Sequence, residues 1–171
     1  MCKEITAAET TAAETPQDKF VYEIPGTLAN YKLVVPERLP GFNEYTDANR
    51  LHPQAGAKMK GRAQELVQWR VYEQLQKQRP IKKPVFLIFN WYEKDRRRDR
   101  DNVSSFGRKV IQDALVEAGV LYDDGWDYVT GYIDRWFIDQ KRPRVEVYFI
   151  EQAGTVKCKN NRKKSSHKHK R

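Results

Sequence analysis

The sequence feature that most restricts the fold is the apolar window from Val85 to Tyr92. It reads Val-Phe-Leu-Ile-Phe-Asn-Trp-Tyr and is rich in β-branched and aromatic residues. A window this short and this apolar is typical of a buried strand, because a helix that crosses a core usually needs about ten residues or more. We therefore predict a central strand over 85–92, with the other elements packed around it.

Two segments with helical periodicity flank the predicted strand. Apolar residues recur at the helical spacing from about Ala57 to Gln78, and again from Val103 to Ala118. In the second segment, Asp101 or Asn102 is placed to cap the first turn, and Gly119 is placed to take the left-handed conformation after the last turn. We expect both amphipathic helices to pack against the sheet.

Short β-prone segments supply the remaining strands. Phe20–Ile24 and Tyr31–Val35 precede the helices, and residues 128–138 and 144–151 follow them. A Lys-Arg-Pro segment between the last two predicts a hairpin. Residues 36–55 contain several Pro and Asn residues and are expected to form a loop. The pattern predicts a single α+β domain in which a mixed sheet carries two main helices on one side.

The two ends of the chain differ in composition from the predicted domain, which we place at 19–156. Residues 1–18 repeat small and acidic residues, and residues 157–171 contain no aliphatic side chain. Neither segment can bury enough apolar surface to offset the entropy lost on ordering, so we expect both to be disordered. Cys2 and Cys158 lie in these opposite ends, which gives no disulfide framework and no common zinc spacing.

The formal net charge of +9 is concentrated at the C-terminal end. Residues 157–171 carry eight Lys or Arg residues and no acidic residue. Such a basic excess favours a nucleic-acid partner, although a solubilising tail or an expression remnant is the alternative interpretation. No apolar run approaches the roughly 20 residues that a membrane span needs, and no secretory signal begins the chain. We expect a cytoplasmic protein without a membrane partner.

Acidic residues occur at both ends of the second predicted helix. Asp99 and Asp101 are two positions apart after the central strand, and in extended backbone they would point to the same side. Asp124 follows Gly119, after which the chain can return toward the sheet. Carboxylates that converge repel one another unless a cation neutralises them, and oxygen ligands favour Mg²⁺, with Mn²⁺ as a possible substitute. Such a site can activate water for phosphodiester cleavage. The alternative is a solvated cluster of charges.

Lys109 adds a cation to this predicted site. It lies on the same helix, at the border of the apolar stripe, and its long side chain is expected to lean toward the helix N-terminus. There it could contact a phosphate, which the helix dipole also favours. Asp113, one turn further along, is expected to be a solvated partner of Lys109 and not a ligand.

Taken together, these motifs resemble the RusA family of Holliday junction resolvases, which are found in bacteria and their phages. The resemblance covers roughly residues 84–150. It rests on Asp99-Arg100-Asp101-Asn102, Lys109, Asp113-Ala114-Leu115, Ala118-Gly119 and Asp123-Asp124-Gly125-Trp126. Leu39–Tyr45 is a weaker match to an Asn-containing loop near the family's N-terminus. The resemblance implies a homodimer that cuts four-way DNA junctions with Mg²⁺. It assigns catalysis and metal binding to Asp99, Asp101 and Asp124, and makes Lys109 the catalytic lysine.

The sequence departs from the family pattern in the second helix, which is about one turn longer between Asp101 and Asp113. Counting from the Asp-Asn end places the catalytic lysine at Ser105, and counting from Asp113 places it at Lys109. We prefer Lys109 because it is the only lysine in the helix. Contacts to the DNA backbone are expected from one further set of polar and basic residues. This set is Arg96, Arg97, Arg98, Arg100, Asn102, Lys58 and Arg62.

Three other functions compete with the nuclease hypothesis. The first is a non-catalytic DNA-binding module, and a nuclease that acts on other branched DNA is a close variant of our preferred function. The second is a nuclease with a Pro-Asp…Glu-x-Lys motif, which the sequence lacks. The third is an RNA-binding protein that stacks bases on Trp126 or Trp136.

Overall fold

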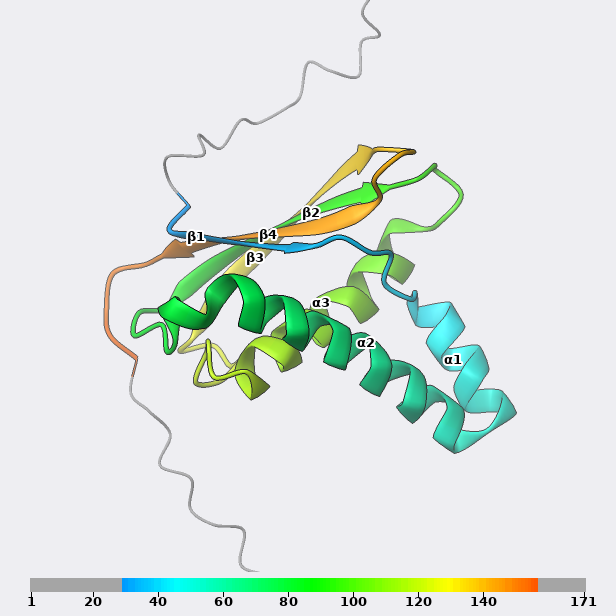
Figure 1. Ribbon diagram of the computed structural model, residues 1–171, viewed down its shortest axis with the longest axis horizontal. Helices are drawn as coiled ribbons and strands as arrows, with labels where there is room; N and C mark the ends of the chain where they lie inside the picture. The colour runs from blue at the N-terminus through cyan, green and yellow to red at the C-terminus, as the bar shows by residue number, and fades with distance from the viewer. Residues whose placement is uncertain (1–28, 157–171) are drawn as a thin grey trace, which may run out of the picture.

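The computed structural model describes residues 29–156 of the protein (Figure 1). The predicted strand Phe20–Ile24 and the predicted disordered ends, 1–18 and 157–171, lie outside these residues. The elements follow one another as β1 (Tyr31–Val35), α1 (Phe42–Leu51), α2 (Pro53–Leu75), the 3-10 helix η2 (Gln76–Gln78), β2 (Val85–Glu93), α3 (Arg100–Glu117), β3 (Val129–Ile138) and β4 (Arg144–Glu151).

The four strands form one mixed sheet in the order β1-β4-β2-β3. Strands β2 and β3 are parallel and are connected through α3, whereas β4 is antiparallel to both β1 and β2. The three helices lie on one side of the sheet (Figure 1). The prediction of an α+β domain with a mixed sheet is therefore confirmed, and so is the central position of the strand over 85–92.

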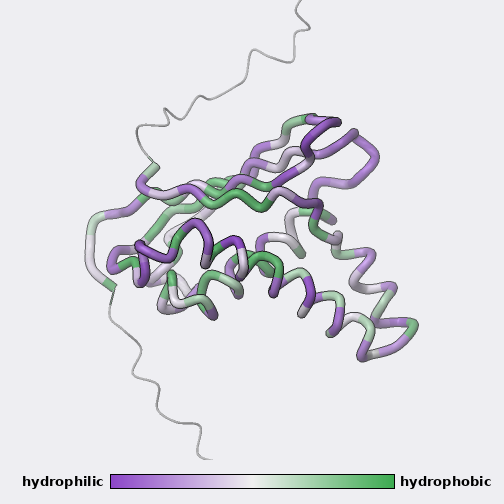
Figure 2. The backbone as a smooth tube through the Cα atoms, in the orientation of Figure 1, coloured by the Kyte–Doolittle hydropathy of each residue, from purple (hydrophilic) through white to green (hydrophobic). Residues whose placement is uncertain are grey.

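The hydrophobic core lies between the sheet and helices α2 and α3. Alternate residues of β2 face the helices, and Leu87, Phe89 and Trp91 are at most 1% exposed. Val71 of α2 and Val110 of α3 are fully buried on the opposite side. Each large apolar side chain buried in this way contributes roughly 1.5–3 kcal/mol. Figure 2 shows hydrophobic residues along the sheet and hydrophilic residues in the loop between β2 and α3.

No helix from the described residues, 29–156, lies on the other face of the sheet (Figure 1). On this face Asn90 of β2 lies between Arg135 of β3 and Glu146 of β4 in the strand register. Glu146 is only 6% exposed and forms salt bridges with Lys32 and Arg144. The open face therefore combines buried polar residues with apolar ones.

The expectation of a loop over 36–55 is wrong, because this segment contains helix α1 and the start of α2. The prolines that suggested a loop lie outside the interior of α1: Pro40 precedes it, and Pro53 begins α2. The few apolar residues of α1, among them Phe42 and Tyr45, lie among polar residues, and none of them is fully buried, so the segment gave only a weak helical signal beside its prolines.

The expectation of a hairpin between the last two strands is also wrong. Strand β2 lies between β3 and β4 and pairs with both of them. The apolar β2 needs a neighbour on each edge, and the aromatic side chain of Trp91 stacks on Trp136 of β3 with ring centroids 5.7 Å apart. The short segment from 139 to 143 therefore carries the chain past β2 and does not form a tight turn between paired strands.

The two ends of α3 differ in how well the sequence predicted them. Its N-cap is Asp99, not Asp101 or Asn102, and the Asp99 carboxylate accepts a hydrogen bond from the backbone N–H of Asp101 at 3.1 Å. Gly119 follows the helix with φ of +72°, a left-handed conformation that glycine adopts without steric cost. The predicted role of Gly119 is confirmed.

Candidate active site and nucleic-acid interface

The acidic pair Asp99 and Asp101 lies at the start of α3, six residues or more beyond the end of β2 at Glu93. Asp99 is the N-cap, and Asp101 belongs to the first helical turn. The expectation that extended backbone turns both side chains to the same side is therefore wrong. Both residues are exposed, at a helix end where the dipole stabilises negative charge.

Among the arginines around this pair, Arg98 faces inward. Its side chain is 14% exposed and forms an ion pair with Glu93 at 3.1 Å. It also donates a hydrogen bond to the backbone carbonyl of Leu39 at 3.0 Å and lies 3.9 Å from Glu44. These contacts fasten the loop before α3 to the segment before α1. Arg98 is therefore a structural residue and not the DNA contact that the sequence suggested.

The neighbouring arginines remain on the surface. The side chain of Arg97 is 89% exposed and lies 3.7 Å from Asp95. Arg100 is exposed, with its guanidinium 6.0 Å from the ring centre of Trp136. Arg96 is also exposed. These three residues are accessible to a polyanion, and their contact with DNA stays a prediction.

Asn102 is used within the fold. Its side-chain oxygen accepts a hydrogen bond from the backbone N–H of Asn43 at 2.6 Å. The N-cap of α1 is Gly41, which has no side chain to cap the helix, so Asn102 supplies that acceptor from α3. A Cβ atom on Gly41 would lie 2.8 Å from the Asn102 amide nitrogen. The predicted DNA contact is thus a link between the first turns of α1 and α3.

Lys109 joins two carboxylates further along α3. Its ammonium lies 2.8 Å from Asp113 and 2.8 Å from Asp124. Asp113 also pairs with Lys60 of α2 at 2.8 Å. The expected pairing of Lys109 with Asp113 is confirmed. The side chain of Lys109 is directed toward these residues, and not toward the N-terminus of α3 as we expected.

The charges in this group stabilise one another. Hydrogen bonds to Asp113 and Asp124 raise the pKa of Lys109 above its ordinary value. Burial opposes ionisation of Asp113, but the hydrogen bonds from Lys109 and Lys60 outweigh it and lower the pKa of that carboxyl. At neutral pH Lys109 is therefore cationic and Asp113 is anionic.

The structure does not gather the three predicted aspartate ligands. Within residues 29–156, no three His, Cys, Asp or Glu side chains lie close enough together to hold a metal ion. Asp101 and Lys109 are separated by about 12 Å along the axis of α3, at 1.5 Å per residue. Asp124 forms an ion pair with Lys109, whereas Asp99 and Asp101 lie at the start of α3. In this arrangement the carboxylates do not fit a shared Mg²⁺ site.

Two features of this surface were not found from the sequence. Lys60 was not predicted, because it lies on a different face of α2 from Lys58 and Arg62, the two cations that the sequence singled out. Asp134 was also not predicted. Its carboxylate binds the guanidinium of Arg108 and accepts a hydrogen bond from the indole N–H of Trp91 at 2.8 Å. Only strand register could have placed Asp134 beside α3.

The tryptophans proposed for base stacking differ in accessibility. Trp126, two residues after Asp124, is 96% exposed. Trp136 is half-buried, and its ring packs on Trp91. Only Trp126 is therefore free to stack on a base without rearrangement of the core.

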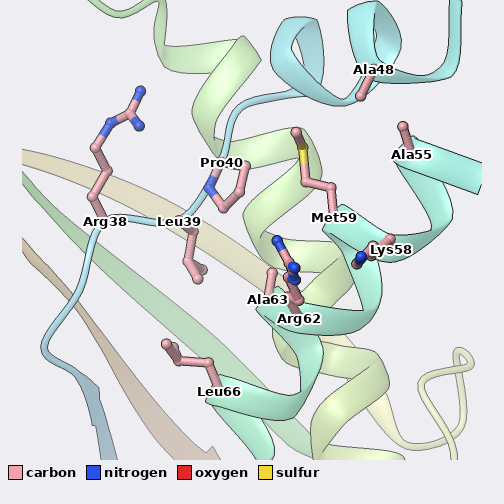
Figure 3. Close-up of a pocket in the computed structure, with 10 residues that line it drawn as sticks. All are labelled: Arg38, Leu39, Pro40, Ala48, Ala55, Lys58, Met59, Arg62, Ala63 and Leu66. Atoms are coloured by element: carbon pink, nitrogen blue, oxygen red, sulfur yellow. The ribbon is translucent and has the colours of Figure 1, made fainter. Parts of the chain in front are cut away.

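Lys58 and Arg62 of α2 lie at a cavity of about 460 Å³ (Figure 3). Both side chains are exposed. The cavity is lined by one set of residues from α1, α2 and the segment before α1. This set is Arg38, Leu39, Pro40, Ala48, Ala55, Lys58, Met59, Arg62, Ala63 and Leu66.

No protein-family model matches the sequence, and no curated protein sequence matches it closely enough to be counted as a relative. Of the helices within residues 29–156, none is both long and apolar enough to cross a membrane. The candidate site therefore rests on its residues and their geometry.

Proposed function

We propose that the protein is a structure-selective DNA endonuclease that hydrolyses phosphodiester bonds in branched DNA, with the four-way junction as its substrate. The observation that carries the proposal is the contact between Lys109 and Asp124, whose charged groups lie 2.8 Å apart. The two residues are 15 positions apart in the sequence. The RusA resemblance assigns both to one active site, and their contact supports that assignment.

The distribution of exposed cations supports a polyanionic substrate. Arg97 and Arg100 flank the start of α3, and Lys58 and Arg62 lie along α2. Cations of this kind contact backbone phosphates without regard to base sequence and release the counterions condensed on DNA. Affinity for the DNA would come from these residues, whereas selectivity for branched DNA would come from shape.

The proposal includes dependence on Mg²⁺, with Mn²⁺ as a substitute. A divalent cation would supply an activated water molecule and stabilise the leaving oxygen. Because Asp99 and Asp101 do not meet Asp124 in this arrangement, the proposal assigns no geometry to the cation. The chain itself places the ammonium of Lys109, which can contact a phosphate, beside the carboxylate of Asp124.

A non-catalytic DNA-binding protein is the second candidate, and one observation favours it. The carboxylates nearest to Lys109 are already neutralised by lysines: Asp124 by Lys109, and Asp113 by Lys109 and Lys60. A site whose charges are mutually satisfied has no electrostatic need for a metal. In that function the acidic residues would only moderate a basic surface.

One experiment separates the two candidates. A labelled four-way junction and a linear duplex of the same sequence are incubated with the full chain in Mg²⁺, in Mn²⁺ and in EDTA. Cleavage of the junction in either metal but not in EDTA supports the endonuclease. Binding without cleavage under all three conditions supports the non-catalytic candidate. Absence of both binding and cleavage would contradict both.

We further propose that the protein acts as a homodimer through the open face of the sheet. Ile133 is 46% exposed there, and Phe86 and Phe137 on the same face are half-buried. Two copies related by a two-fold axis would bury this face and present two opposed sites to a symmetric junction. Sedimentation should show a dimer that Ile133→Asp converts to a monomer. A wild-type monomer on junction DNA would exclude the dimer.

A further inference from the structure

The cavity beside α2 combines an apolar floor with a cationic rim (Figure 3). Leu39 and Ala63 are buried, and Met59 and Leu66 are partly exposed at its wall. Its volume of about 460 Å³ lies within the roughly 300–1,000 Å³ that is common for small-ligand sites. The cavity is open to solvent and has room for one planar ring system together with a charged group.

The cations at the cavity differ in whether an acidic residue already pairs with them. Arg38 is paired with Glu44, and Figure 3 shows its side chain extending away from the other lining residues. Within residues 29–156, Lys58 and Arg62 make no ion pair or side-chain hydrogen bond. They lie one helical turn apart, so both can reach the same anion. Among the residues that the structure describes, no carboxylate lines the cavity to neutralise them.

The apolar wall suits an unsaturated ring. Pro40 and Leu66 offer flat aliphatic surface, and the thioether of Met59 makes favourable contacts with aromatic groups. An inorganic anion alone would use the two cations and leave this wall exposed to water. A molecule with a ring at one end and a phosphate at the other would use both parts.

The cavity adjoins the start of α3. Pro40 lines the cavity, and the next residue, Gly41, lies against the side chain of Asn102. Arg98 holds the carbonyl of Leu39 from the other side. The start of α3, where Asp99 and Asp101 lie, is therefore next to the segment that forms one wall of the cavity.

We propose that this cavity binds a nucleoside monophosphate unit, with the base against Met59 and Leu66 and the phosphate held by Lys58 and Arg62. In DNA the unit would be a single unpaired nucleotide turned out of the helix. This proposal rests on the proposed function in taking DNA as the partner. It adds a site that selects DNA with an unpaired base, separate from the carboxylates of α3.

The first test measures binding of free dAMP to the full chain in EDTA, by calorimetry or by chemical-shift changes. The matched probes are inorganic phosphate and deoxyadenosine. We expect dAMP to bind at least tenfold more tightly than either part alone. Equal affinity for phosphate and dAMP would overturn the proposal, because the cavity would then be only a cationic patch. Tighter binding of an acidic peptide than of dAMP would also overturn it.

Substitutions locate the binding. Lys58→Gln and Arg62→Gln should each weaken dAMP binding by about tenfold, equivalent to about 1.4 kcal/mol. Lys77→Gln removes the same charge beyond the far end of α2 and should leave binding unchanged. Met59→Glu should abolish binding by placing a carboxylate in the cavity, whereas Met59→Leu should preserve it. If Met59→Glu does not fold, the two charge variants decide the matter. Full binding by both would refute the site.

The second test uses DNA and separates this proposal from the proposed function. A duplex carries 2-aminopurine either as a single-nucleotide bulge or in a base pair, and its fluorescence is followed in EDTA, where cleavage is not required. We expect a change with the bulge that Lys58→Gln and Arg62→Gln reduce. The cavity site is overturned if these variants leave the fluorescence change unaltered. It is also overturned if 2-aminopurine in a base pair gives the same change as in the bulge. Failure of junction cleavage in Mg²⁺ contradicts only the endonuclease.

Discussion

The side-chain oxygen of Asn102 accepts a hydrogen bond from the backbone N–H of Asn43, with 2.6 Å between nitrogen and oxygen, so a residue of α3 caps helix α1. Asn102→Ala should lower the free energy of unfolding by about 0.5–2 kcal/mol, the usual effect of losing an N-cap. Asn102→Asp keeps the acceptor and places a negative charge at the start of α1, so it should retain stability. Urea unfolding of both variants checks this. Equal stability of Asn102→Ala and wild type would show that the bond contributes nothing.

The carboxylates are tested by removing charge without changing shape. Asp99→Asn, Asp101→Asn and Asp124→Asn should each abolish junction cleavage and leave junction binding unchanged or tighter, because less negative charge faces the phosphates. Asn caps a helix as well as Asp does, so Asp99→Asn should preserve the start of α3. Asp95→Asn, in the loop before the helix, is the matched control for charge. Wild-type cleavage by any of the three variants would remove that residue from the proposed site.

Lys109 and Ser105 are compared directly. Lys109→Ala should slow cleavage by about 10²-fold or more, the scale of losing one contact to transition-state charge, with little change in binding. Ser105→Ala, one turn away on an exposed position, should cleave at the normal rate. Single-turnover kinetics with saturating enzyme measure both. The opposite result would show that the helix aligns with the family from its Asp-Asn end.

The group around Asp113 should make stability depend on pH. Its pKa in the folded protein lies below the ordinary value of 3.8, so the ionised carboxylate stabilises the fold above that value. This stabilisation is lost as the pH falls through the lowered pKa. Asp113→Asn should therefore be less stable than wild type near neutral pH and equal to it in strong acid. Unfolding by urea across the acid range tests this, and a difference that persists in strong acid would contradict it.

Much of the fold could be predicted because the relevant signals are local. The apolarity of Val85–Tyr92 predicted β2, and the periodicity after Asn102 predicted α3 together with its end at Gly119. Helix α1 was missed because prolines lie on both sides of it, its apolar signal is weak, and its cap is supplied from 59 positions away in the sequence. The hairpin was wrong because the position of β2 between β3 and β4 is set by packing across the sheet, which no local spacing reveals.

The candidate site was predictable only in part. The resemblance assigned Lys109 and Asp124 to one site, and the structure brings their charged groups into contact. The same reasoning expected Arg98 to face DNA, whereas the carboxylates of Glu93 and Glu44 hold it inside. Which of several neighbouring arginines turns inward depends on acceptors supplied by other elements. A charge run in the sequence does not contain that information.

The pairing of β1 with β4 closes the sheet across almost the whole described chain, since Tyr31 binds Glu151 from 120 positions away. Closing so long a loop costs entropy before Leu33 and Val35 of β1 are buried. We therefore expect β1 to join a sheet already built from β2, β3 and β4, and to be the first strand to detach. Its departure would leave one edge of β4 unpaired and able to accept a strand from another molecule. The strand that we expect to fold last is thus the one that covers this edge of β4.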